Sequence, residues 1–193
     1  FVSPITAIRR VRIEGALPGD EQRLAQLVKP LQGIPCVRID PRGVESAVLE
    51  LPEVKSAELR RNPFGSALLT VKYRQPVAKL ASAPNMMLDA DGVLYRTMQT
   101  FDGIPVVTVP RSGPPTLVTI VGNWQPQRLA KLAAIARDLA PSDVISLQVS
   151  ESGGVSVRLG SKQVIFGSLD DLDRKVDVLN QRMVTYPNEL TEN

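Results

Sequence analysis

The first third of the chain alternates between strand-like and helix-like patterns of apolar positions. Residues 10–14 alternate polar and apolar side chains with period two, which predicts a strand. Leucines and valines at helical spacing over 24–31 predict a short amphipathic helix, and Asp40 followed by Pro41 is typical of the start of a second helix. Two further strands are expected at 54–61 and 67–74. The predicted order is strand, helix, helix, strand, strand.

The second half of the chain is predicted to be rich in strands. Residues 86–95 indicate two strands joined by a turn. Apolar positions at helical spacing mark one helix over 129–139 and another over 169–183, with Ser168 and Asp171 placed as a capping box for the second. Additional strands are expected at 106–109, 116–121, 144–149, 155–159 and 163–166.

These elements divide the chain into two domains of an α+β fold. A three-stranded sheet with two helices on one face is a complete two-layer unit, so we expect a first domain at 1–81, with the order β-α-α-β-β. The remainder, 82–193, is expected to be a β-rich domain with two helices packed on its sheet.

The composition is that of a folded protein with a basic first domain. Of 193 residues, 43% are hydrophobic and 22% are charged, which is ordinary globular usage. Residues 1–81 hold 13 Lys/Arg against 8 Asp/Glu, whereas 82–193 hold 10 against 12. This excess suits an anionic membrane surface or an acidic partner. Interspersed carboxylates and only eight aromatic residues argue against nucleic-acid binding.

The residues that usually perform catalysis are sparse. The chain has no histidine, which removes the commonest general base, the Ser-His-Asp arrangement and His-ligated metal sites. Its single cysteine, Cys36, lies between apolar residues and is interpreted as a small buried side chain. Glycine-rich phosphate-binding motifs and the nucleophile-elbow motif are absent. We predict no catalytic, cofactor-binding or metal-ligating residues, no cofactor and no enzymatic activity.

One acidic stretch invites a second interpretation. The run 89–92 reads Asp-Ala-Asp-Gly, which can open a calcium loop or form a hairpin turn. An EF-hand needs its glycine at loop position six and a glutamate at position twelve, and neither is present when counting from Asp89. The hairpin turn is the favoured interpretation.

Basic side chains accumulate on the three strands of the first domain, several of them at alternate positions that can share one sheet face. Such a face is either exposed to solvent, with charged side chains that protect the sheet edges, or a surface that contacts a partner. A second basic set lies on the last predicted helix. The candidate partner-binding residues are Arg60, Arg61, Lys72, Arg74, Arg174, Lys175 and Arg182.

Several short motifs occur in a characteristic order along the chain. They are Val11-Arg12-Ile13-Glu14-Gly15, Gly33-Ile34-Pro35, Leu51-Pro52-Glu53-Val54, Arg60-Arg61-Asn62-Pro63, Gln75-Pro76-Val77-Ala78 and Leu88-Asp89-Ala90-Asp91-Gly92. Together, over about residues 8–183, they resemble the POTRA domain and β domain of the FtsQ/DivIB family of bacterial cell-division proteins. Asn62-Pro63 stands where the family usually has Trp-Pro, and Tyr73-Arg74 replaces its common Glu-Arg.

The resemblance implies a scaffold of the cell-division machinery rather than an enzyme. Family members bind partners of the FtsB and FtsL type and link them to septal peptidoglycan synthesis. They are single-pass proteins of the cell membrane, with this region extracytoplasmic and concentrated at the septum. The resemblance places the membrane helix before Phe1 and the family's terminal β strands about where Asn193 ends. Partners would bind by strand addition to a sheet edge or by helix contacts.

Two other classes stay open on the sequence. The first is a POTRA-containing protein of an outer-membrane assembly or secretion system, in which further POTRA units or a barrel of long alternating strands follow. The second is an unrecognised enzyme, which would need a convergent pair of acidic or nucleophilic side chains in a pocket.

Overall fold

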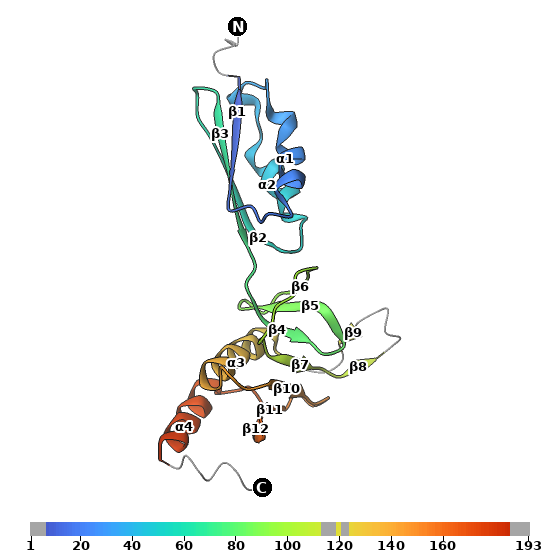
Figure 1. Ribbon diagram of the computed structural model, residues 1–193, viewed down its shortest axis with the longest axis vertical. Coiled ribbons are helices and arrows are strands. Elements are labelled where there is room, and N and C mark those ends of the chain that lie inside the picture. The colour runs from blue at the N-terminus through green and yellow to red at the C-terminus, as the bar shows by residue number, and fades with distance from the viewer. Residues whose placement is uncertain (1–6, 113–118, 121–123, 186–193) are drawn as a thin grey trace. The chain divides into compact units, whose positions relative to one another are not determined.

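The computed structural model describes residues 7–112, 119–120 and 124–185; for 111–112, 119–120, 180 and 182–185 it describes the backbone alone. Within these ranges the protein is mixed α+β, with four α-helices and sheets of three, seven and two strands. The chain divides into two compact units, Phe1–Arg74 and Gln75–Asn193, which can be followed by colour in Figure 1. This division comes before the boundary expected after residue 81, because Pro76–Leu80 forms a strand of the second unit's sheet.

The first unit has the order strand, helix, helix, strand, strand. Its elements are β1 (Arg10–Glu14), α1 (Glu21–Val28), α2 (Pro41–Leu49), β2 (Val54–Arg61) and β3 (Ser66–Tyr73), with single 3₁₀ turns at Lys29–Leu31 and Cys36–Arg38. Strand β3 lies in the middle of the sheet, parallel to β1 and antiparallel to β2. Both helices lie on the same side of this sheet in Figure 1.

Apolar side chains on the helix-facing side of the sheet form the core of the first unit. Leu24 of α1 and Val48 of α2 are fully buried against the sheet residue Leu69. Helix α2 begins where the sequence predicts, because the Asp40 carboxylate accepts the backbone N–H of Arg42 at 3.1 Å. The opposite face of the sheet carries no helix of this unit in Figure 1, and its residues alternate with the buried ones.

A glycine at the end of β1 allows two backbone segments to approach closely. Gly15 has a φ of 82°, in the left-handed region, and a Cβ built on it would lie 2.2 Å from the carbonyl oxygen of Val71. Any other residue would therefore be strained in its own backbone and would push β3 away. This explains why the strand that starts the chain's first sheet must end in glycine.

The second unit is built on the seven-stranded sheet. Its elements are β4 (Pro76–Leu80), β5 (Ala83–Asp89), β6 (Leu94–Arg96), β7 (Val106–Thr108), β8 (Arg111–Ser112), β9 (Thr119–Ile120), α3 (Pro126–Leu139), β10 (Ile145–Val149), β11 (Val155–Leu159), β12 (Lys162–Gly167) and α4 (Leu172–Thr185). The strand order is β12-β11-β10-β7-β4-β5-β6, and β8 pairs with β9 separately. Most of the strand expected at 116–121 lies outside the described residues.

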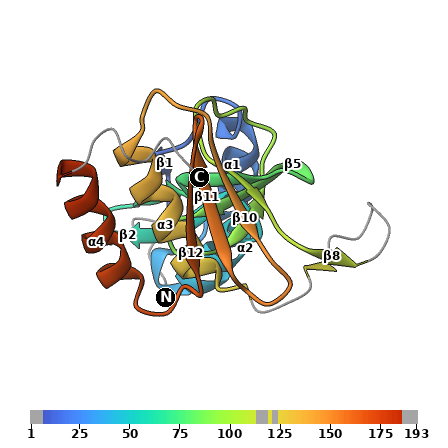
Figure 2. The ribbon, with the colours of Figure 1, turned by 90° about the horizontal axis from the view of Figure 1, so that it is seen from below.

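The centre of this sheet is parallel and fully buried. Strand β7 runs parallel to both β4 and β10, so that Val107 lies between Leu80 and Leu147, and all three side chains have no exposed surface. Helix α3 packs over these strands through Leu129 and Ala133, which are also completely buried. Figure 2 shows α3 and α4 side by side.

The acidic stretch in this unit is a hairpin turn, as the sequence indicates. One carboxylate oxygen of Asp89 accepts the backbone N–H groups of Asp91 and Val93 at 3.0 and 2.8 Å. Gly92 adopts a φ of 80° between β5 and β6. The carboxylate of Asp89 is therefore engaged in holding the turn.

The start of α4 differs from the predicted capping box. The helix begins at Leu172, because Asp171 has a φ of 53°, which a helical residue cannot adopt. Ser168 instead accepts the backbone N–H of Asp170 at 3.1 Å and donates its hydroxyl to the Asp170 carboxylate at 2.5 Å. A compact turn thus replaces the expected cap.

We predict that Gly15→Ala destabilises the first unit by about 3 kcal/mol, since it adds both backbone strain and a clash with Val71. Gly33→Ala keeps the positive φ but meets nothing within 4 Å, and should cost about 1 kcal/mol. Gly19→Ala has neither penalty and should change stability by less than about 0.5 kcal/mol. Amide hydrogen exchange in β3 measures all three, and equal effects would contradict the close approach.

Candidate functional site

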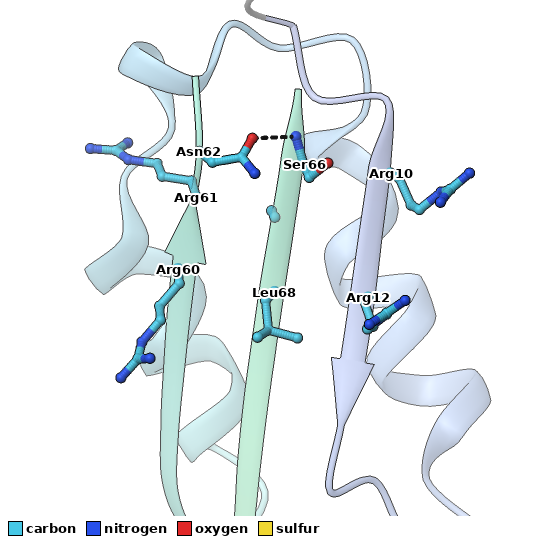
Figure 3. Close-up of a pocket in the computed structure, with 8 residues that line it drawn as sticks. Arg10, Arg12, Arg60, Arg61, Asn62, Ser66 and Leu68 are labelled. Carbon is cyan, nitrogen blue, oxygen red and sulfur yellow. Dashed lines mark hydrogen bonds between the residues drawn. The ribbon is translucent and has the colours of Figure 1, made fainter. Parts of the chain in front are cut away.

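A shallow hollow of about 340 Å³ lies on the open face of the three-stranded sheet, and four of its eight lining residues are arginines. We call it the arginine hollow. Arg12 of β1 and Arg60 of β2 both pair with Leu68 of β3 in the sheet, so one arginine lies on each side of the leucine. Arg10 comes two residues before Arg12 in β1 and lies opposite Ser66. Figure 3 shows these side chains on the face of the sheet that is turned away from the helices.

Carboxylates occupy the neighbouring row of the same face. Glu14 and Glu58 both lie opposite Thr70 of β3. Glu58 accepts a hydrogen bond from the Arg60 guanidinium at 2.7 Å, which lowers the pKa of the carboxyl and raises that of the guanidinium. The face is therefore balanced in charge along its middle and positive toward the end where Arg10 lies.

The four candidate residues of the first unit do not form one surface. Arg60 lines the hollow on its open face. Arg61, its neighbour in the strand, borders the hollow but donates a hydrogen bond to the carbonyl of Ile39. Lys72 shares the open face but lies beyond the carboxylate row, and Arg74 follows the end of β3, where its Nε donates to the carbonyl of Pro52 at 3.2 Å.

A second hollow, of about 520 Å³, runs between β12 and α4 in the second unit. We call it the β12–α4 groove. Its walls are mostly apolar: Val164, Ile165 and Phe166 come from β12, and Val178 and Leu179 come from α4. Ile165 is 79% exposed and Val178 is 50% exposed, so two large apolar side chains of the groove are open to solvent.

Strand β12 is the edge of the seven-stranded sheet. Among the described residues it pairs with β11 only, and β11 separates it from β10. An edge strand presents backbone N–H and C=O groups that a further strand can pair with. The groove therefore combines an apolar floor with a strand edge that can accept another chain.

The candidate residues on α4 have different environments. Arg174 is exposed and lines the groove. The Nζ of Lys175 donates to the carbonyls of Phe166 and Ser168, at 3.1 and 2.5 Å, and so ties α4 to the end of β12. Arg182 lies on α4, but its side chain is outside the described residues. Arg174 is thus available for a partner, whereas Lys175 supports the groove.

Two ion pairs hold the start of α4 against α3. The Arg128 guanidinium lies 2.5 Å from the Asp170 carboxylate, and Lys131 lies 2.5 Å from Asp173. The pKa of Asp170 is lowered, first by the hydrogen bond from Ser168 and then by that from Arg128. These exposed ion pairs add to the burial of Leu172, Val176 and Leu179, which holds this wall of the groove against the core.

Some residues of the two hollows are missing from the candidates predicted from the sequence, although sequence patterns indicate their positions. Arg10 and Arg12 belong to the period-two pattern of β1 and share a face by that pattern alone. The run 164–166 is apolar throughout, and because strand residues alternate, at least one of them must point away from the core. Val178 lies off the buried stripe of Leu172, Val176 and Leu179 on α4.

Comparisons with known proteins do not place the chain in a family: no protein-family model matches it, and no curated protein sequence matches it significantly. In the part of the chain that the structure describes, no cluster of three or more acidic, cysteine or histidine side chains could hold a metal ion. No helix among the described residues combines the length and the apolarity that crossing a bilayer requires. The surfaces themselves must carry the functional argument.

We predict that the turn before α4 weakens in acid. The pKa of Asp170 is lowered in the folded protein, so its charged form stabilises the turn above the ordinary value of 3.8, and this contribution is lost as the pH falls through the folded pKa. Asp170→Asn should speed hydrogen exchange at the start of α4 about threefold at pH 7, as expected for an exposed ion pair.

The comparison variant is Asp177→Asn, an exposed carboxylate on the same helix. It should leave exchange at the start of α4 unchanged at pH 7. Wild type and Asp170→Asn should exchange alike once Asp170 of the wild type is protonated. A difference between the two proteins that persists unchanged to pH 2 would mean that the carboxylate's charge does not hold the turn.

Proposed function

We propose that this protein is a cell-division scaffold of the FtsQ/DivIB type, which binds and positions division proteins of the FtsB and FtsL type at the septum. The observation that carries the proposal is the β12–α4 groove, where a strand edge that no described residue pairs with, two exposed apolar side chains and the exposed Arg174 meet. These features suit binding of an extended or helical peptide segment. Turnover of a substrate is not part of the proposed function.

The positions of the resemblance motifs support the proposal. The Leu51-Pro52 pair forms the turn between α2 and β2, and the Gln75-Pro76 pair marks the passage into β4 of the second unit. The acidic motif forms the β5–β6 hairpin. These three motifs therefore have structural reasons for their proline, glycine or aspartate. They lie in an α+β chain of two units, the first of which has its helices on one sheet face.

The groove's chemistry defines what a partner must offer. Backbone groups of an added strand would complete the hydrogen bonds of the β12 edge, which gives affinity with little sequence demand. An apolar side chain of the partner would cover Ile165 and Val178, and an acidic one would meet Arg174. Specificity would come from the apolar and acidic positions rather than from the backbone.

In the proposed setting the protein belongs to the cell membrane, as a single-pass protein with this region extracytoplasmic. Its groove would recruit partner segments that lie on the same side of the membrane and so connect them to septal peptidoglycan synthesis. The competing role is that of a POTRA-containing protein of outer-membrane assembly or secretion. Such a protein would bind other partners, so the binding experiment below distinguishes the two roles.

We predict saturable binding between the purified chain and the extracytoplasmic segments of FtsB- and FtsL-type proteins from the same organism, measured by titration calorimetry. Ile165→Lys should weaken binding at least tenfold, since it replaces an exposed apolar side chain that lines the groove with a charged one. Arg174→Glu should weaken it by a similar factor if an acidic side chain of the partner meets it. Hydrogen exchange in β12 should slow on binding when a strand is added.

Matched controls are Met98→Lys, which changes a side chain that is 88% exposed elsewhere in the second unit, and Arg137→Glu on the exposed side of α3. Both should bind as the wild type does. Binding that survives Ile165→Lys and Arg174→Glu would retain the function and remove the groove as its site. Absence of any binding to these segments would favour the outer-membrane assembly or secretion systems.

A further inference from the structure

One end of the first unit exposes two large apolar side chains. Phe64, in the turn between β2 and β3, is 84% exposed, and Val37, in the 3₁₀ turn after α1, is 71% exposed. Neither side chain lines the arginine hollow or the β12–α4 groove. A single exposed apolar side chain is common on protein surfaces, but two large ones at one end of a unit, beside charged residues, form a candidate contact surface.

Hydrogen bonds place these two turns at the same end of the first unit. The N–H groups of Arg9 and Arg10 both donate to the carbonyl of Gly65, so the start of β1 is fixed beside the β2–β3 turn. Arg61 reaches from the end of β2 to the carbonyl of Ile39, two residues beyond Val37. The turn that carries Phe64 and the turn that carries Val37 therefore belong to the same end of the unit.

The same end is densely basic. We call it the basic tip, and define it by Phe64, Val37 and the exposed residues Arg9, Arg10, Arg38 and Arg61. Two carboxylates lie close to the tip in sequence: Asp40, which caps α2, and Glu58, which pairs with Arg60. The tip thus combines four exposed arginines with apolar side chains that are open to solvent.

The arginine hollow adjoins the basic tip, because the two surfaces share residues. Arg10 and Arg61 belong to both, and Figure 3 shows them at the same end of the sheet, near Asn62 and near Ser66 at the start of β3. Arginine forks match the oxygens of a phosphate group with two parallel hydrogen bonds. An anionic phosphate near Phe64 could therefore be held by side chains of the hollow.

We propose that the basic tip is an interfacial anchor that docks on the headgroup layer of an anionic phospholipid membrane. Phe64 and Val37 would enter the boundary between headgroups and acyl chains, while the surrounding arginines contact lipid phosphates. An acidic peptide would account for the charge but not for the two exposed apolar side chains, whereas the boundary between headgroups and acyl chains accounts for both. The inference does not depend on partner binding at the β12–α4 groove.

The test is sedimentation of the whole chain with vesicles. Vesicles of phosphatidylcholine with 30% phosphatidylglycerol, at an ionic strength of about 0.05 M, should bind the protein, whereas pure phosphatidylcholine vesicles should not. Arg9→Gln and Arg10→Gln should each weaken binding about fivefold, and Phe64→Ser about tenfold. Phe64→Trp should give a blue shift of tryptophan emission on adding the anionic vesicles.

Control variants are Arg137→Gln, Arg158→Gln and Met98→Ser, which remove two exposed arginines and one exposed apolar side chain from the second unit. They should bind as the wild type does, and circular dichroism should show that all variants are folded. Equal binding to neutral and anionic vesicles, or no effect of the tip variants, would overturn the proposal. Arginine-dependent binding of a glutamate-rich peptide without vesicle binding would overturn it in favour of an acidic protein partner.

Discussion

The seven-stranded sheet depends on the pairing of one very short strand. Strand β7 has three residues, yet it alone joins β4-β5-β6 to β10-β11-β12 in the strand order. So short a pairing is sufficient because Val107 is sealed between Leu80 and Leu147, and because α3 approaches closely through Ala130 and Ala133. This packing decides that β12 becomes an edge and that α4 lies beside it.

The sequence predicts the elements well where local pattern and burial agree. Strands with clear period two, such as β1 and β11, and the helix that Asp40 caps, lie where the pattern places them. The order of strands in the second sheet could not be predicted, because parallel pairing of β7 with β4 and β10 joins segments distant in the chain. Residues 76–80 resemble a linker because of their proline, although they form a central strand.

The structure brings together only some of the basic side chains that the sequence grouped, for reasons that concern single side chains. Arg60 and Arg61 are adjacent in a strand, so period two already requires that they face opposite sides, and only Arg60 joins the open face. The role of Lys175 depends on two carbonyls at the end of β12, whose positions follow from the turn at Asp171. No local pattern reports such a contact.

The two surfaces rest on different physics, which separates their roles. The arginines of the basic tip are exposed, so salt screens their contacts over a Debye length of about 8 Å at physiological ionic strength. In the β12–α4 groove the apolar walls and backbone groups contribute little that depends on salt, and the contact of Arg174 is the part that salt would screen. Raising the ionic strength should therefore weaken binding of the tip to a membrane more than binding of a peptide in the groove, so a single protein can lose one contact and keep most of the other.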